Sequence, residues 1–262
     1  MFWVKKMENP LKIKLSSGQP VLGIWSIIPS PIVIEIFGLA GLDFQILDME
    51  HGVFDLQALD ANIRACESVH CSPLVRVPSI VPHIFQSALD LGAHGIIVPQ
   101  ITDEITARTA VQCMKYSPEG VRGYNPFTRA ALYSNPPTNE TGKLNNRFGF
   151  SSIIIENESA YRSLDKILTI SDLDMVYVGV YDMAVALGCK GDVSHPKVVD
   201  FVETSIRRIR DAGKAAGMMV KTQSEIEYAL KLGANVLVFA VDTFVIHRAA
   251  SEIVQLFRDT QK

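Results

Sequence analysis

Eight short apolar runs, each followed by a helix-like pattern, are the strongest constraint on the fold of this 262-residue chain. The runs lie at residues 21–27, 44–51, 73–77, 95–99, 152–156, 174–180, 218–221 and 236–240. No hairpin signal joins any two of them, so consecutive strands are expected to run parallel and to be connected by helical crossovers. Eight such units in about 250 residues predict a single (β/α)8 TIM barrel domain, an α/β fold covering residues 1–262.

An open doubly wound sheet is the alternative α/β architecture. It is less favoured because no Gly-x-Gly-x-x-Gly pattern follows the first strand. No change in composition marks a second domain. A long stretch at residues 117–149, rich in Gly, Pro and Asn, interrupts the alternation. A segment of this length is typical of a lid, a binding loop or a mobile segment.

Composition argues against several classes of function. The chain is 48% hydrophobic and 20% charged, which supplies a substantial core and argues against disorder. Its formal net charge of -3 gives no basic surface, so no nucleic-acid partner is expected. Residues 1–10 have mixed charge and no stretch is long enough to span a membrane, so neither a signal peptide nor a membrane partner is expected. Four cysteines without metal-site spacing are expected to be core thiols, which predicts a cytoplasmic protein.

Ionisable residues gather at the ends of the predicted strands. In a closed barrel all strand carboxyl ends meet at one mouth. The side chains expected there are Asp48, Glu50, His51, Arg76, Gln100, Glu156, Asp182, Lys221 and Asp242. Glu156 and Asp182 follow neighbouring strands, and two carboxylates that leave positions for water and substrate suit Mg²⁺ or Mn²⁺. We therefore predict that Glu156 and Asp182 bind a divalent metal ion (Mg²⁺, Mn²⁺ or Co²⁺).

Other mouth residues suit binding and proton transfer. Arg76 offers a planar fork that matches a carboxylate. His51 is the natural general base because an imidazole titrates near neutral pH, and Asp90, among apolar neighbours in a helix, is a candidate partner for it. Together these groups suit proton transfer on a small oxo-acid beside a metal that stabilises a developing enolate. The expected substrate contacts are Arg76, Gln100, Tyr181 and Asp182.

Each of these roles has a simpler alternative. Asp182 could be only a helix N-cap, Arg76 could only balance the carboxylates of the second strand, and Asp90 could be an exposed surface group. The turn that carries the histidine could be a polar surface turn. Lys221 could instead form a Schiff base in a metal-free aldolase, although the two metal-binding carboxylates would then have no task.

Seven motifs occur in the order seen in one enzyme family. They are LDMEHG at 47–52, VRVP at 75–78, LDLGA at 89–93, GVRG at 120–123, IE at 155–156, VGVYD at 178–182 and VDT at 241–243. In these motifs the sequence resembles the HpcH/HpaI family of metal-dependent class II aldolases, which act on pyruvate-type enolates. The resemblance implies a barrel with Glu156 and Asp182 as metal ligands. It also implies that Arg76 stabilises the oxo-acid and that a His51–Asp90 dyad handles the proton.

The resemblance further implies a homohexamer, a trimer of dimers that exchange their last helix. Two residues depart from the family pattern near the metal. Ile154 stands where the family usually has Gln, and the bulky Tyr181 stands where members carry a small residue. Residues 135–149 also lack the usual helix-like pattern before the fifth strand.

The sequence therefore predicts a lyase that reversibly cleaves a 4-hydroxy-2-oxo acid to pyruvate, or a close 2-oxo acid, and an aldehyde. The alternative within the family is a condensing enzyme that uses the enolate with another acceptor. A siderophore-type citrate synthase acting on oxaloacetate and acetyl-CoA is one example. A catalytically silent ligand-binding barrel would need the metal pair or the histidine to be missing, and neither is.

Overall fold

The chain folds into a closed barrel of eight parallel strands, described by a computed structural model for residues 8–134 and 138–261. Neighbouring strands pair in sequence order, and the last strand pairs with the first. The strands are β1 (Val21–Ser26), β2 (Phe44–Asp48), β3 (Ser72–Arg76), β4 (Gly95–Val98), β5 (Phe150–Ile155), β6 (Met175–Val178), β7 (Ala215–Val220) and β8 (Val236–Val241). The predicted (β/α)8 barrel is confirmed, and an open sheet is excluded.

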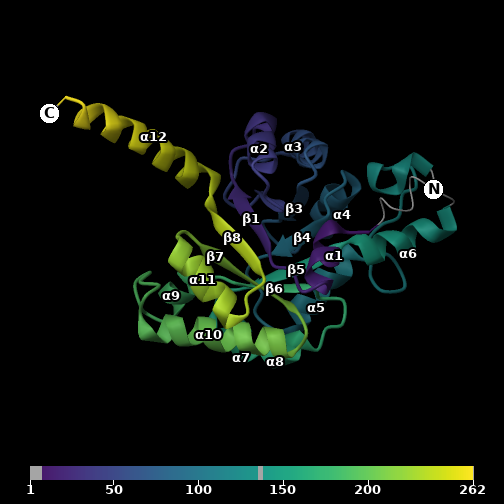
Figure 1. Cartoon of the computed structure of the whole chain (residues 1–262). Helices are drawn as coiled ribbons and strands as arrows, with labels where there is room; N and C mark the ends of the chain where they lie inside the picture. Colours follow the sequence, from purple (N-terminus) through teal and green to yellow (C-terminus); the bar gives the residue numbers. More distant parts are fainter. Residues whose placement is uncertain (1–7, 135–137, 262) are drawn as a thin grey trace.

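Helices surround the barrel, except the last helix, which extends away from it (Figure 1). They are α1 (Pro10–Ser16), α2 (Pro31–Leu39), α3 (Leu56–Ser68), α4 (Pro82–Asp90), α5 (Glu104–Met114), the 3₁₀ segment η2 (Arg129–Ser134), α6 (Thr138–Phe148), α7 (Glu158–Arg162), α8 (Leu164–Leu168), α9 (Val180–Ala186), α10 (Pro196–Asp211), α11 (Gln223–Leu232) and α12 (Asp242–Asp259). Asp55 and Asp103 cap α3 and α5 by accepting backbone N–H groups of the first turn. None of the helices in the described part of the chain combines the length and apolarity that a membrane crossing needs.

Successive side chains along each strand point alternately into and out of the barrel, so the protein has two hydrophobic cores. Inward-facing side chains such as Phe44, Ile46 and Tyr177 fill the barrel, and outward-facing ones pack beneath the helices. Leu11 of α1 joins the interior cluster. Because α1 precedes β1, it closes the barrel at the amino ends of the strands. The opposite end, where the strands finish, is the mouth.

Three local features of the structure were not predicted from the sequence. Residues 10–16 form α1, which is stabilised by the Asn9 side chain accepting the backbone N–H of Leu11, by Pro10 in the first turn and by burial of Leu11. Strand β7 begins at Ala215, before the predicted run at 218–221, because residues 215–217 pair with β6. Helix α6 covers most of the stretch judged to lack a helical pattern. The side chain of Asn146 stabilises α6 by bonding the backbone N–H and C=O of Tyr116 at 2.7 and 2.9 Å. The Pro-rich residues 135–137 lie outside the described residues.

The stretch 117–149 lies at the amino ends of the strands, opposite the mouth. It connects α5 to β5, and Arg129 ties it to the barrel by donating to the carbonyl of Leu91 at 3.0 Å and by pairing with Glu67 of α3. His94 Nε2 also lies 3.3 Å from Glu67 Oε1. Burial alone would raise the pKa of Glu67, but His94 and Arg129 lower it to about 2. The described part of this stretch is therefore no lid over the mouth of its own chain.

Candidate active site

Arg76 and Asp48 form the best-connected ion pair of the mouth. They end neighbouring strands in register. Arg76 Nε donates to Asp48 Oδ1 at 2.8 Å, Nη2 donates to Asp48 Oδ2, and Nη1 lies 3.2 Å from Glu50 Oε2. Burial opposes the charge of Arg76, but the bond to Asp48 and the nearby carboxylates, including Glu156, raise its pKa. The guanidinium also lies 4.3 Å from the centre of the Trp25 ring.

The pairing of Arg76 with the carboxylates of the second strand, considered above as an alternative, is thus present. This pairing does not use all the N–H donors of the Arg76 side chain. A guanidinium has about five N–H groups, and three contacts occupy only part of that set. The remaining donors are available to a bound oxo-acid, and the ion pair fixes their direction.

Gln100 holds two mouth carboxylates in place. Its backbone N–H donates to Glu156 Oε1 at 2.6 Å, and its Nε2 donates to Glu50 Oε1 at 3.0 Å. Gln100 adopts a left-handed φ of 56°, which is uncommon outside glycine. Burial and the charges of Asp182 and Glu50 raise the pKa of Glu156, against the bond from Gln100 and the charge of Arg76. The mouth therefore brings together three carboxylates that repel one another.

Glu156 and Asp182, the predicted metal ligands, come from the end of β5 and the first turn of α9. The N-cap of α9 is Gly179, and no side chain caps this helix, so Asp182 is not the helix N-cap. Gly179 makes room for Glu156: a Cβ there would lie 2.8 Å from Glu156 Cβ and 3.3 Å from its Oε2. A backbone without a side chain at this position lets the Glu156 carboxylate lie against the start of α9.

The donor set fits a divalent cation. Mutual repulsion among neighbouring carboxylates is what a bound Mg²⁺ or Mn²⁺ relieves, and such ions take oxygen ligands. Across residues 8–134 and 138–261 no group of three or more His, Cys, Asp or Glu side chains is arranged to hold a metal. Two carboxylates with water and substrate oxygens completing the shell are the usual pattern for these ions.

His51 and Asp90 lie at opposite ends of the barrel. His51 follows β2 at the mouth, where its backbone N–H donates to Asp48 Oδ1 at 3.2 Å. Its side chain is 68% exposed, and the ring Nε2 lies 4.0 Å from Glu50 Oε2. Asp90 is the last residue of α4, and its Oδ1 accepts a bond from Arg122 Nη2 at 2.5 Å. Asp90 is therefore a half-buried ion-pair member, not an exposed surface group. The two side chains do not meet within one chain, and the dyad stays a prediction for the assembled protein.

Trp25 and Tyr177 form the floor of the mouth, which sequence reasoning missed. Trp25 Nε1 donates to the Tyr177 hydroxyl at 3.2 Å, and the rings meet edge to face with centroids 5.5 Å apart. Burial raises the pKa of Tyr177, so the phenol stays neutral. Ile154 belongs to the same interior cluster. The inward alternation of β1 and β6 was the available signal.

The far side of the mouth carries Tyr181 and Lys221. Lys221 Nζ lies 4.8 Å from the centre of the Tyr181 ring, which is 41% exposed. Asp242 has a structural role: its Oδ2 accepts the backbone N–H groups of Ile27 and Ile28 at 3.0 and 2.9 Å. It thereby anchors the turn that follows β1.

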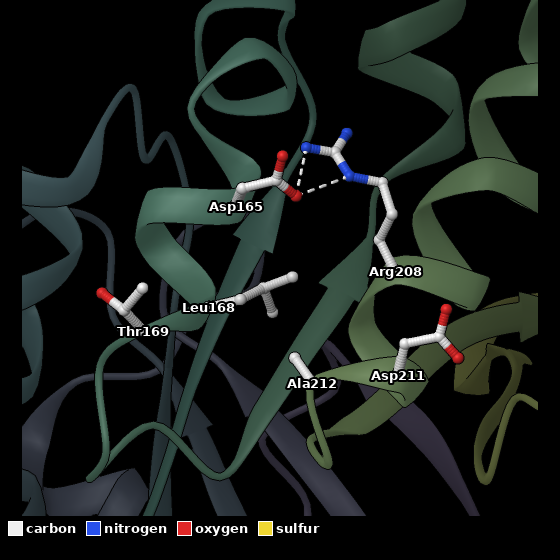
Figure 2. A pocket seen from close by; sticks show the side chains of 6 residues that line it. All are labelled: Asp165, Leu168, Thr169, Arg208, Asp211 and Ala212. Carbon is white, nitrogen blue, oxygen red and sulfur yellow. Dashed lines mark hydrogen bonds and ion pairs between the residues drawn. The ribbon is translucent and has the colours of Figure 1, made fainter.

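Two surface hollows lie away from these groups. Figure 2 shows one, of about 530 Å³, where Asp165 of α8 pairs with Arg208 of α10 at 2.8 Å. The other, of about 570 Å³, lies around His94 and Arg129 at the closed end of the barrel. Neither is lined by the mouth residues.

Known proteins resemble the chain over nearly its whole length. The family model described as HpcH/HpaI aldolase/citrate lyase matches residues 22–249. A hydroxypyruvate/pyruvate aldolase from Roseovarius nubinhibens is 30% identical over 251 residues, covering 95% of this chain and 97% of that protein. A 5-keto-4-deoxy-D-glucarate aldolase from Salmonella arizonae is 29% identical, with 95% and 97% covered. The crystal structure of the citrate synthase SbnG matches with a TM-score of 0.88 at 27% identity, covering 96% of this chain and 98% of its own. The chain belongs to the HpcH/HpaI aldolase/citrate lyase family.

Proposed function

We propose that this protein is a divalent-metal-dependent aldolase that reversibly cleaves a 4-hydroxy-2-oxo acid to pyruvate, or a close 2-oxo acid, and an aldehyde. The observation that carries the proposal is the set of contacts at the mouth in which Gln100 donates to both Glu156 and Glu50 while Arg76 pairs with Glu50. The two aldolases among the relatives support the reaction type. The same names support a small-molecule 2-oxo acid and an aldehyde as the substrates.

Glu156 and Asp182 would hold the metal ion, which we propose to be Mg²⁺, Mn²⁺ or Co²⁺. When bound, such an ion supplies Lewis-acid polarisation of the keto oxygen and stabilises the enolate charge. Gln100 sets the direction of Glu156 through its backbone N–H. Gln100, Tyr181 and Asp182 are the further substrate contacts that we propose.

Arg76 binds the carboxylate of the oxo-acid with its remaining N–H groups, while Asp48 holds the fork in place. In the cleavage direction His51 Nε2 accepts the proton of the 4-hydroxyl group. The C3–C4 bond then breaks, the aldehyde leaves, and the enolate takes a proton at C3 to give the 2-oxo acid. A general base of this kind contributes about 10²–10⁴-fold to the rate.

Metal removal tests the proposal. Activity should vanish after dialysis against chelator and return with Mg²⁺, Mn²⁺ or Co²⁺, with products identified by mass spectrometry. Glu156→Gln and Asp182→Asn should each weaken Mn²⁺ binding. Calorimetry measures this binding directly and does not depend on enzyme activity. Full activity in excess chelator, with borohydride trapping of pyruvate on Lys221, would replace this mechanism by Schiff-base chemistry.

The second candidate is a condensing enzyme that forms an enolate at the same site and joins it to another acceptor. The similarity to SbnG, a citrate synthase, favours it. In that reaction the enolate would form on the acetyl group of acetyl-CoA and add to the keto carbon of oxaloacetate, and water would hydrolyse the thioester to release citrate and free CoA. Offering both compounds to the metal-loaded protein and searching for citrate by mass spectrometry separates the two candidates.

We also propose a homohexamer, a trimer of dimers that exchange α12. Figure 1 supports it, because α12 extends away from the barrel instead of covering β8 and β1. Its exposed apolar side chains are Phe244, Ile246, Ile253, Val254, Leu256 and Phe257. Ile32, Ile36 and Leu39 on α2 are also exposed, as expected if a partner helix covers them. Light scattering should give a hexamer, and Leu256→Asp combined with Phe257→Asp should give smaller species.

The cytoplasm is the compartment we propose. All four cysteines are buried free thiols, and free thiols persist in reducing compartments. Thiol titration of the denatured protein, isolated from its own cells without reductant, should return four free groups.

A further inference from the structure

We infer that the hydroxyl of Tyr177 donates a hydrogen bond from the floor of the mouth to the enolate oxygen of the bound 2-oxo acid. The inference rests on the proposed aldolase function and adds to it a residue that contacts the reacting atoms. It also gives a task to a hydroxyl that lies within a hydrophobic cluster in the barrel interior.

The Tyr177 hydroxyl carries a proton without an acceptor. An indole N–H can only donate, so the hydroxyl is the acceptor in its 3.2 Å bond with Trp25 Nε1. Within residues 8–134 and 138–261 no oxygen accepts a bond from this hydroxyl in return. Tyr177 is only 4% exposed, and a buried polar group that lacks a partner is costly. An oxygen of a bound ligand would complete its hydrogen bonding.

Strand register places Tyr177 one step below the predicted metal ligand Glu156. Tyr177 pairs with Ile154 across β5 and β6, and both side chains belong to the interior cluster. Because side chains alternate along a strand, Glu156 is the next inward position after Ile154. The charges of Glu156 and Arg76 both act on the pKa of Tyr177, in opposite directions. The hydroxyl therefore lies beneath the groups that we propose to hold the oxo-acid.

Two glycines give the Tyr177 ring its space and leave it open toward the mouth. Gly217 of β7 pairs with Tyr177, and a Cβ at position 217 would lie 2.8 Å from Tyr177 Cδ2. Gly179 is the next inward position after Tyr177, since a Cβ there would lie 3.1 Å from Ile154 Cγ2. No side chain from β6 therefore covers the phenol from the side of the mouth.

Trp25 connects Tyr177 to the group that binds the oxo-acid. The Arg76 guanidinium lies 4.3 Å from the centre of the Trp25 ring, while the indole N–H bonds the Tyr177 hydroxyl. A carboxylate bound by Arg76 is therefore held close to the same indole that orients the phenol. Negative charge develops on the keto oxygen of the oxo-acid as the C3–C4 bond breaks, and a preorganised neutral donor stabilises that charge.

The experiment compares the binding of oxalate, whose second carboxylate imitates the enolate oxygen, with that of pyruvate. Calorimetry measures both in the Mn²⁺-loaded protein. Tyr177→Phe, which removes only the hydroxyl, should weaken oxalate binding by about tenfold or more, because a hydrogen bond to a charged oxygen is lost. Pyruvate and Mn²⁺ should bind nearly as in wild type. Tyr116→Phe is the matched control. Tyr116 is 3% exposed and its hydroxyl is also unpaired in the described part of the chain, but it packs beside α6, away from the mouth, so oxalate should bind as in wild type.

Exchange of the pyruvate methyl protons for deuterium, followed by NMR without any aldehyde, separates this inference from the function beneath it. Tyr177→Phe should slow exchange by about tenfold or more at saturating pyruvate, a loss in kcat with KM little changed. If wild type exchanges protons but Tyr177→Phe binds oxalate as wild type does, or loses oxalate and pyruvate affinity equally, the inference is wrong and the aldolase proposal stands. If wild type shows no exchange, the aldolase proposal fails and the inference fails with it.

Discussion

Arg76 Nε and Asp48 Oδ1 lie 2.8 Å apart, and these residues occupy paired register positions on β2 and β3. The pair is therefore set by backbone geometry, and its two-point form depends on the planar guanidinium. A lysine at position 76 would keep the charge but lose the fork. Replacing Arg76 by lysine therefore distinguishes an ion pair that only stabilises the fold from one that also orients a ligand.

Arg76→Lys should fold, keep its metal affinity and lose about 2–4 kcal/mol of transition-state stabilisation, the scale for one well-placed charge stabiliser in a dry site. The measurement is kcat/KM for enolate exchange, with the thermal midpoint recorded alongside. Arg64→Lys, an exposed i,i+4 pair on α3, serves as the control. A catalytic efficiency near that of wild type would assign Arg76 to the scaffold.

His51→Ala should lower turnover by about a hundredfold or more while leaving Mn²⁺ affinity nearly intact, because the ring is exposed at the mouth and is no predicted metal ligand. Asp90→Asn should act in the same direction with a smaller effect if Asp90 reaches His51 between subunits. Steady-state rates and metal titration check both. His83→Ala, an exposed histidine on α4, is the control, and a His51→Ala enzyme of normal turnover would remove the proposed base.

Gly179→Ala should weaken metal binding by about tenfold or more and reduce activity in proportion. The added Cβ would lie 2.8 Å from Glu156 Cβ, so the Glu156 side chain must shift. Gly142→Ala is the matched control, because its Cβ would lie 3.8 Å from Tyr116 in the interior of a helix. That change should raise stability by about 0.5–1 kcal/mol. Unchanged Mn²⁺ affinity in Gly179→Ala would place Glu156 outside the metal shell.

Glu67→Gln should destabilise the protein by about 1–3 kcal/mol at pH 7, because it leaves a charged partner without its counterion. The pKa of Glu67 is lowered from 4.5 to about 2, so the stabilisation it provides is complete above pH 4.5 and is lost as pH falls toward 2. The free energies of unfolding of wild type and Glu67→Gln, measured by denaturant melts at several pH values, should therefore converge as the pH falls. A difference that stays constant between pH 7 and pH 3 would contradict this. Glu104→Gln, on an exposed helical pair, should change little at any pH.

The barrel could be predicted because its determinants are local. Each strand is a short apolar run, and each helix begins or ends at a residue of known preference, such as Asp55 and Gly233. The errors occur where tertiary contacts override local pattern. Asn146 stabilises α6 through backbone groups of a distant turn, and pairing with β6 brings residues 215–217 into β7. Neither contact leaves a periodic signal in the sequence.

The sequence predicts which residues lie at the mouth but not which of them contact one another. Topology alone brings Glu156, Asp182 and Arg76 to one end, and the family assignment that their motifs suggested is confirmed. Which groups touch depends on register and on side-chain reach. The double contact of Gln100 requires a left-handed backbone, which no motif announced. His51 and Asp90 are separated because His51 follows β2 at the mouth, whereas Asp90 ends α4, the helix that leads from the mouth back to the amino ends of the strands.

The indole of Trp25 lies 4.3 Å beneath the Arg76 guanidinium, and this proximity gives the mouth an optical property. The chain contains two tryptophans, and the other, Trp3, lies outside the described residues. A Trp3→Phe protein would therefore carry one fluorophore, with a cation over its face. Emission from that indole should change when a bound oxo-acid draws Arg76 toward itself. Ligand entry then becomes visible without turnover, label or coupled assay.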